Sequence, residues 1–196
     1  MINHVAGVVL AAGESSRYGT PKQNLPWGKC TVLGASIHNA QIAGLKPIEV
    51  VLGAHAEAIS KLLTPGNYHV IHNLNWKAGM GSSISAGVKS LPADTEGVIL
   101  ILADQPHISP LLIRSIKTEG KMRNKIIVPE IAGRRANPVY FPNYTFPELI
   151  ELDADIGGRA LFSRFEIHTL KWMDDSMAGD IDQPEAYQVL KELFNP

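Results

Sequence analysis

An apolar run that leads straight into a turn of small residues constrains this chain more than any other feature. Residues 5–10 read Val-Ala-Gly-Val-Val-Leu, which is typical of a buried β-strand. Residues 11–13, Ala-Ala-Gly, follow at once, and a polar loop then leads to Arg17 and Lys22. Small side chains let a ligand approach backbone N–H groups, and two cations offset negative charge. The stretch therefore indicates a site for a polyphosphate at the end of the strand.

Strand-like and helix-like segments alternate along the rest of the chain. We expect strands over 48–53, 68–73, 97–104, 126–131, 138–141 and 166–172, and helices over 32–43, 56–63, 83–91, 110–117 and 185–194. This order predicts a Rossmann-like, three-layer α/β/α fold with a mainly parallel mixed sheet. Ligands of such folds gather at the carboxyl ends of the strands.

Composition limits the class of protein and its surroundings. The chain has 196 residues, of which 45% are apolar, and we expect one domain over 1–196. A net charge of −1 argues against nucleic acid as the main partner, and no apolar run is long enough to span a membrane. A single cysteine, Cys30, and the lack of a secretion signal favour a cytoplasmic location.

The well-known phosphate-binding loops do not fit this turn. A P-loop has four residues between its glycines, whereas five separate Gly13 from Gly19, and Lys22 follows a proline. The turn is not a Gly-x-Gly-x-x-Gly motif, and the chain holds no Gly-x-Ser-x-Gly elbow. A different nucleotide-binding motif is needed to explain it.

The stretch from residue 10 to residue 22 resembles the signature Leu-Ala-Ala-Gly-x-Ser-x-Arg-x-Gly-x-Pro-Lys of the MobA-like nucleotidyltransferases, which have a GT-A-type fold. All nine fixed positions match, which an ordinary strand-to-helix turn with surface charges would rarely do. The resemblance implies that Arg17 and Lys22 act on the phosphates. It also implies nucleotide contacts at Leu10, Ala11, Ala12, Gly13 and Lys22.

A glycine- and serine-rich segment precedes the helix expected over 83–91. Its residues either offer N–H groups to an anion or a polar base, or simply cap the helix. The segment resembles the Gly-Met-x-Ser-Ser element of the same family, which faces the base and the ribose. The resemblance implies nucleotide contacts at Gly79, Met80, Gly81, Ser82 and Ser83.

Three aspartates are candidate metal ligands. Asp104 ends the apolar stretch 97–104, where it would either bind Mg²⁺ beside a triphosphate or cap the turn before Pro106. Asp180 and Asp182 lie two residues apart, so they point to one side of an extended chain, although a solvated acidic loop explains them as well. Resemblance to the family's Leu-x-Asp-x-Pro and Asp-Ile-Asp elements implies that Asp104 holds Mg²⁺, and we favour Asp182 over Asp180 as its partner.

Two further segments resemble elements that we expect to handle the second substrate. Residues 133–141 resemble Gly-x-Arg-Gly-His-Pro-Val-x-Phe, but Asn137 stands in place of the histidine and cannot titrate near neutrality. Residues 155–161 resemble Asp-x-Gly-Ala-Arg-x-Leu. We expect Arg135, Asn137 and Arg159 to contact the acceptor, with Arg159 either clamping a phosphate or pairing with Asp155.

The Ala-Ala-Gly turn and the Asp-Ile-Asp segment most resemble the molybdenum cofactor cytidylyltransferase branch. The resemblance implies transfer of CMP from CTP to the terminal phosphate of a molybdopterin-type cofactor, with Mg²⁺ as cofactor and pyrophosphate as product. One alternative is a nucleotidyltransferase that acts on a sugar phosphate or another small phosphate, or that uses GTP. Another is a nucleotide- or cofactor-binding protein without turnover.

Overall fold

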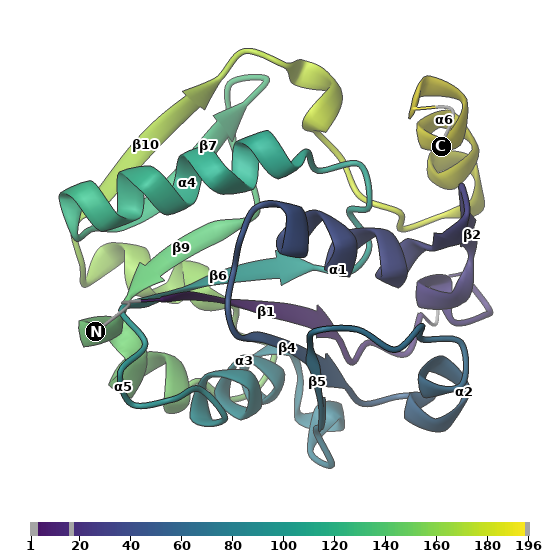
Figure 1. Cartoon of the computed structure of the whole chain (residues 1–196), viewed down its shortest axis with the longest axis horizontal. Helices are drawn as coiled ribbons and strands as arrows, with labels where there is room; N and C mark the ends of the chain where they lie inside the picture. Colours follow the sequence, from purple (N-terminus) through teal and green to yellow (C-terminus); the bar gives the residue numbers. More distant parts are fainter. Residues whose placement is uncertain (1–3, 16–17, 195–196) are drawn as a thin grey trace.

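A mixed β-sheet forms the centre of the protein. The computed structural model describes residues 4–15 and 18–194, and within them eight strands join in one sheet of order β10-β7-β9-β6-β1-β4-β5, with β8 beside β7 (Figure 1). The strands are β1 (Val5–Ala11), β4 (Ile48–Leu52), β5 (His69–His72), β6 (Gly97–Leu102), β7 (Ile126–Ile131), β8 (Arg134–Arg135), β9 (Val139–Pro142) and β10 (Ile167–Trp172).

The sheet is mainly parallel, as predicted. β1 pairs in parallel with β4 on one side and with β6 on the other. β5 pairs in parallel with the other edge of β4, and β10 runs parallel to β7. β9 runs antiparallel to both β6 and β7. The central position of β1 and β6 follows from their composition, because strands covered on both faces need apolar side chains at every position.

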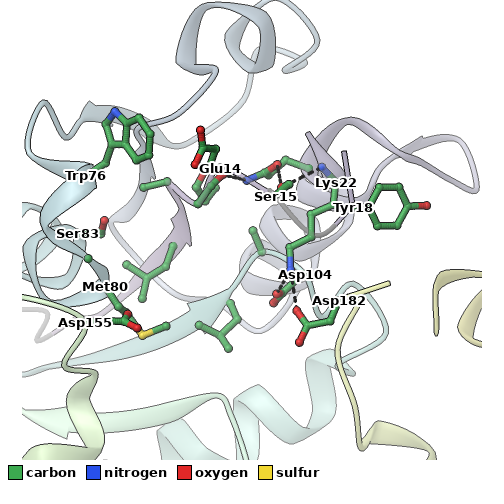
Figure 2. A pocket seen from close by; sticks show the side chains of 18 of the residues that line it. Glu14, Ser15, Tyr18, Lys22, Trp76, Met80, Ser83, Asp104, Asp155 and Asp182 are labelled. Carbon is green, nitrogen blue, oxygen red and sulfur yellow. Dashed lines mark hydrogen bonds and ion pairs between the residues drawn. The ribbon is translucent and has the colours of Figure 1, made fainter. Parts of the chain in front are cut away.

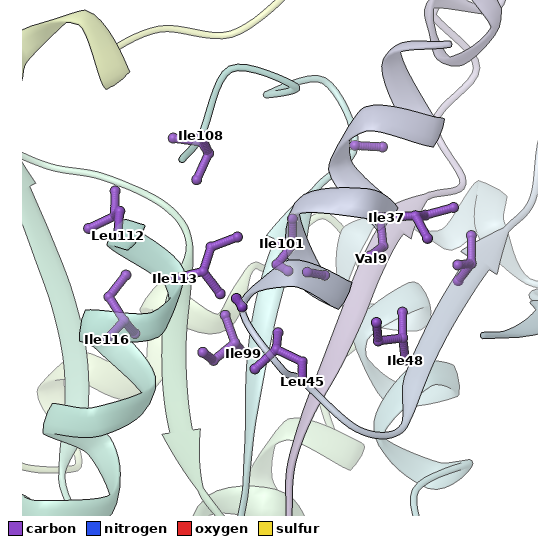
Figure 3. Close-up of a cluster of buried hydrophobic side chains, with 14 of the residues drawn as sticks. Val9, Ile37, Leu45, Ile48, Ile99, Ile101, Ile108, Leu112, Ile113 and Ile116 are labelled. Carbon is purple, nitrogen blue, oxygen red and sulfur yellow. The ribbon is translucent and has the colours of Figure 1, made fainter. Parts of the chain in front are cut away.

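Helices cover both faces, which confirms the three-layer prediction. α1 (Val32–Ile42) and α4 (Pro110–Arg123) lie on one face, and α3 (Met80–Lys89) and α5 (Phe146–Ile150) on the other (Figure 1). Successive side chains of a strand point to opposite faces, so β1 sends Val9 into the cluster under α1 and α4 and Val8 into the cluster against α3. Figure 3 shows the first cluster, in which Ile99 and Ile101 of β6 lie among isoleucines from both helices.

A smaller unit closes one end of the sheet. The hairpin of β2 (Pro26–Trp27) and β3 (Cys30–Thr31) packs with α6 (Pro184–Phe194). The Tyr187 hydroxyl of α6 donates a hydrogen bond to the Pro26 carbonyl.

A further helix, α2 (Ala56–Ser60), follows β4. No described helix has both the length and the apolarity needed to cross a membrane.

Several predicted boundaries were wrong for identifiable reasons. The helix predicted from residue 83 begins at Met80, because the Gly and Ser residues of its first turn have low helix propensity and hid it. The helix predicted to end at 117 runs to Arg123, where Asn124 in the left-handed conformation ends it. The apolar stretch 97–104 leaves the sheet after Leu102, so Asp104 lies in the turn beyond the strand. α5, β8 and the β2–β3 hairpin are too short to have been predicted from periodicity.

Gly120 lets α4 pack closely on β9. A Cβ atom at this position would lie 2.5 Å from the ring of Tyr140, a side chain that is only 2% exposed. Contact at that distance is impossible, so the Tyr140 ring fills the space that a larger residue at position 120 would need.

We expect Gly120→Ala to lower the free energy of unfolding by up to about 2 kcal/mol, because an overpacking cost of about 1–3 kcal/mol outweighs the roughly 1 kcal/mol gain in helix propensity. Urea denaturation measures the change. Thr118→Ala is the control, since residue 118 is exposed on the same helix, and it should cost little. Stabilisation by Gly120→Ala would show that the tyrosine does not fill this space.

Candidate functional site

A cleft of about 610 Å³ opens at the carboxyl ends of β1 and β6 (Figure 2). The two strands are adjacent and parallel, so the turns that follow them meet at one edge of the sheet. Ten of the residues singled out from the sequence line it: Leu10, Ala11, Ala12, Gly13, Lys22, Gly79, Met80, Ser83, Asp104 and Asp182. Glu14, Ser15, Tyr18, Gln23, Trp76, Lys77 and Asp155 line it as well and were not predicted as site residues. Arg17 lies outside the described residues.

The turn after β1 leaves open space toward the cleft. A Cβ atom on Gly13 would have no atom of the described chain within 4 Å, apart from its chain neighbours, and Gly13 does not adopt a positive φ angle. Neither packing nor backbone conformation therefore requires glycine here. The space that a side chain would fill remains available to a ligand.

Two other glycines serve a different purpose. A Cβ atom on Gly79 would lie 2.5 Å from the backbone of Ala154, and one on Gly81 would lie 2.7 Å from the backbone of Asp153. The Gly81 N–H also donates to the Ala154 carbonyl at 3.0 Å. These glycines allow the segment 153–155 to lie against the start of α3. Gly81 is buried there and does not line the cleft.

Asn73 sets the positions of the two predicted serines. Its buried side-chain amide donates to Ser82 Oγ at 2.9 Å and to Ser83 Oγ at 3.0 Å. The Ser82 hydroxyl has acceptors in the Asn75 and Gly79 carbonyls, so Ser82 fixes the loop before α3 and does not line the cleft. Ser83 lines the cleft, and among the described residues its hydroxyl hydrogen has no acceptor.

Asp104 and Asp182 lie at the opposite end of the cleft from Trp76 and Met80 (Figure 2), and Asp180, which does not line the cleft, joins them there. Asp104, Asp180 and Asp182 each place a carboxylate oxygen within 4.8 Å of the others. Lys22 Nζ lies 2.6 Å from Asp104 Oδ2 and 3.1 Å from Asp182 Oδ1. A cation thus already sits among these oxygens.

Burial and charge change the protonation of this cluster. Burial alone would lower the pKa of Lys22, but the carboxylates of Asp104 and Asp182 raise it above its usual value. Burial, followed by the negative charges of Asp182 and Asp104, raises the pKa of Asp180. The lysine is therefore held in its charged form, while burial and repulsion favour the protonated form of Asp180.

The segment that carries Asp180 and Asp182 is held by its backbone and by the residue between them. Ile181 is fully buried against the β2–β3 hairpin and α6, and its N–H donates to the Asp104 carbonyl at 3.0 Å. Gln105 Nε2 donates to the Gly179 carbonyl at 3.1 Å. With Ile181 anchored on one side, the two aspartates beside it are left on the side of Asp104.

This cluster fits a hard divalent cation. Asp104 Oδ1 is buried and has no hydrogen-bond partner among the described residues. A buried carboxylate oxygen without a partner is costly, and Mg²⁺ and Mn²⁺ prefer carboxylate oxygen ligands. Asp104, Asp180 and Asp182 are the residues that would hold such an ion.

The three residues predicted to contact the acceptor do not line the cleft. Arg135 is exposed on β8, with its guanidinium 5.7 Å from the centre of the Phe162 ring. Asn137 precedes β9. Arg159 is exposed and makes no ion pair with Asp155 within the described part of the chain, which disfavours the pairing considered above.

Comparison with known proteins decides the family. A family model described as "MobA-like NTP transferase domain" matches residues 7–170. This range includes the turn after β1, the start of α3 and Asp104. The chain belongs to the MobA-like NTP transferase family. It is accordingly a nucleotidyltransferase by family, and its sheet has the arrangement expected of that fold.

Several known proteins are similar to this chain over almost its whole length. The crystal structure of Rv0371c from Mycobacterium tuberculosis H37Rv has a TM-score of 0.85 and 31% identity, covering 98% of this chain and 100% of that chain. Another structure of Rv0371c is a complex with manganese. Molybdenum cofactor cytidylyltransferase of Escherichia coli is 26% identical over 189 residues, covering 95% of each chain. Nicotine blue oxidoreductase of Paenarthrobacter nicotinovorans is 28% identical over 193 residues, covering 92% of this chain and 93% of that one.

The manganese complex and the acidic cluster together support divalent metal use in this family. A metal held by Asp104 and Asp182 would lie close to the ammonium of Lys22, which pairs with both carboxylates. We therefore expect Lys22→Gln to raise the affinity for Mn²⁺ in the absence of nucleotide by roughly tenfold. The lysine ammonium and a divalent ion on the same carboxylates repel each other by more than about 1 kcal/mol, and the variant removes this repulsion. Titration followed by the EPR signal of free Mn²⁺ measures it.

Lys77→Gln is the matched control for this experiment. Lys77 also lines the cleft, but its ammonium lies over the Trp76 ring at 5.5 Å from the ring centre. It should leave Mn²⁺ affinity nearly unchanged. Equal affinities in wild type and Lys22→Gln would mean that the ion binds elsewhere.

Proposed function

We propose that this protein is a cytidylyltransferase that transfers CMP from CTP to the terminal phosphate of a molybdopterin-type cofactor and releases pyrophosphate. The observation that carries the proposal is a cluster of three aspartates, two of them paired with Lys22, beside an open turn of small residues. A nucleoside triphosphate needs backbone donors, a cation and carboxylates for a metal, and the cleft offers all three.

The two ends of the cleft suit the two ends of a nucleotide. The phosphates would lie along the turn that contains Ala11, Ala12 and Gly13, near Lys22, and the family signature adds Arg17. The base and ribose would lie toward Trp76, Met80 and Ser83, where the Ser83 hydroxyl hydrogen has no acceptor in the described part of the chain. Gly79, Gly81 and Ser82 build this end of the cleft through the contacts described above.

The reaction requires no nucleophilic side chain. An oxygen of the acceptor phosphate attacks the α-phosphorus in line, a new P–O bond forms, and the bond to pyrophosphate breaks. Lys22 would stabilise the negative charge that builds on the phosphate oxygens. Asp104, with Asp182 and Asp180, would hold a divalent cation, for which we propose Mg²⁺, and a bound metal neutralises phosphate charge as a Lewis acid.

The acceptor would approach over the strands next to β6. Arg135 and Arg159 are exposed and can each bind a phosphate with two hydrogen bonds, and Asn137 can donate and accept. Because these residues lie outside the cleft lining, we assign them to the part of the acceptor farther from the reacting phosphate.

Two observations support CTP and a molybdopterin acceptor over other substrates. The turn after β1 reads Ala-Ala-Gly, as in the cytidylyltransferase branch that it resembles, and the cytidylyltransferase of Escherichia coli aligns over 95% of this chain. A similar protein carries the name of an oxidoreductase, so identity at this level leaves the reaction to be tested directly.

CTP with Mg²⁺ should stabilise the protein against heat more than ATP, GTP or UTP does. Ligand binding to the native state adds about 2.7 kcal/mol at a hundredfold excess over Kd, and a thermal-shift series with the four nucleotides measures it. A larger shift with GTP would overturn the choice of base and leave nucleotidyl transfer intact. Equal, negligible shifts with all four would count against the nucleotide site.

Asp104→Asn should reduce pyrophosphate release from CTP, Mg²⁺ and a molybdopterin acceptor by roughly 10³-fold, since a neutral amide binds hard cations poorly. Asp155→Asn is the matched control, because Asp155 lines the same cleft outside the acidic cluster, and it should keep most activity. Normal turnover in Asp104→Asn would remove this residue from the mechanism. Binding of CTP without any release of pyrophosphate by wild type would favour the non-catalytic alternative.

A further inference from the structure

Gln23 is a buried amide that contacts the turn after β1 at three places. It lies in the short 3₁₀ helix Lys22–Asn24, next to Lys22, and only 3% of it is exposed. Its Nε2 donates to the Ala11 carbonyl at 3.2 Å and to the Gly13 carbonyl at 3.0 Å. Its Oε1 accepts from Ser15 Oγ at 3.2 Å.

These bonds complete the pairing of the carbonyls along the turn. The Leu10 carbonyl accepts from the Ala103 N–H, and the Ala12 carbonyl accepts from the Ala54 N–H, each at 3.1 Å. The carbonyls of Ala11 and Gly13 accept no hydrogen bond from these neighbouring segments. Both accept from the side-chain amide of Gln23 instead. Four consecutive carbonyls from residue 10 to residue 13 are therefore held by donors of the protein.

The orientation of the carbonyls decides what the turn offers a ligand. A carbonyl oxygen that faced the cleft would repel phosphate, whereas an N–H attracts it. With the carbonyls held, the N–H groups of Gly13 and Glu14 donate no hydrogen bond to any part of the chain that the structure describes. Both residues line the cleft, so these donors are available to an anion.

The same amide is linked to Lys22 through Ser15. Ser15 Oγ donates to Gln23 and accepts from the Lys22 N–H at 3.2 Å. Ser15 has a φ angle of 57°, an unfavourable conformation for a residue with a side chain, so these bonds hold the loop in a shape that it would not otherwise prefer.

We propose that Gln23 is a positioning residue that fixes the turn after β1 for binding the triphosphate of the nucleotide. It acts through the turn: its amide holds two carbonyls away from the phosphates, and the adjacent N–H groups stay available to them. The inference rests on the proposed function, since it concerns the nucleotide of that reaction. It predicts that Gln23 governs the preference for a nucleoside triphosphate over the nucleoside alone.

Gln23→Glu tests the proposal with almost no change in size. The carboxylate can still accept from Ser15 but cannot donate to the carbonyls of Ala11 and Gly13, which it repels. Isothermal titration should show affinity for CTP with Mg²⁺ reduced roughly 10–100-fold, as expected when charge-assisted bonds to phosphate are lost. Affinity for cytidine should fall less than about threefold, since the base end of the cleft does not contact Gln23.

Gln23→Met provides the same test if the charged variant does not fold, because it removes both donors without adding charge. Thr145→Val is the control for lost stability. Thr145 is fully buried and donates to the Pro142 carbonyl at 2.7 Å, far from the cleft. It should lower the melting temperature while leaving the ratio of CTP to cytidine affinity unchanged.

The outcomes separate this inference from the proposed function. An unchanged ratio in both Gln23 variants, with CTP still bound tightly by wild type, would overturn the role of Gln23 alone. An equal loss of affinity for CTP and cytidine would make Gln23 a purely structural residue and would also overturn it. Wild type that binds CTP no better than cytidine would overturn the proposed triphosphate site itself.

Discussion

The ion pairs of Lys22 with Asp104 and Asp182 join three distant parts of the chain. The lysine lies 82 residues from one carboxylate and 160 from the other, and it brings together the turn after β1, the turn after β6 and the segment before α6. Without a cation, carboxylates within 4.8 Å of one another would repel. The acidic end of the cleft therefore depends on positive charge, which Lys22 supplies within the part of the chain that the structure describes.

The rest of the fold keeps these groups in place. β1 and β6 are buried on both faces and pair residue by residue, so the turns that follow them have fixed positions relative to each other. The segment with Asp180 and Asp182 lacks such a strand and is held by Ile181, Gln105 and the packing of α6. Each side of the cleft is thus stabilised differently, one by the sheet and the other by a buried isoleucine, a side-chain hydrogen bond and the packing of α6.

The sequence could predict the features that composition encodes locally. The continuous apolar runs of β1 and β6 and the aspartate after the second run were recognisable because burial on both faces excludes polar residues. The roles of Gln23 and Asn73 could not be predicted, because the sequence does not distinguish an amide that is buried from one that is exposed. Their hydrogen-bond partners become known only from the fold. Gly13 and Gly81 illustrate the same limit: one leaves space for a ligand and the other lets two backbones touch.

The placement of Ile181 has a consequence for how the protein is made. During synthesis Lys22 leaves the ribosome well before Asp182, which neighbours Ile181 and lies 160 residues further along the chain. Until then, Asp104 lacks the two carboxylates that lie beside it in the folded protein. The pocket for Ile181 between the β2–β3 hairpin and α6 does not yet exist either. The three carboxylates therefore cannot meet until the segment with Asp180 and Asp182 has been made, so the acidic end of the cleft is incomplete on any shorter nascent chain.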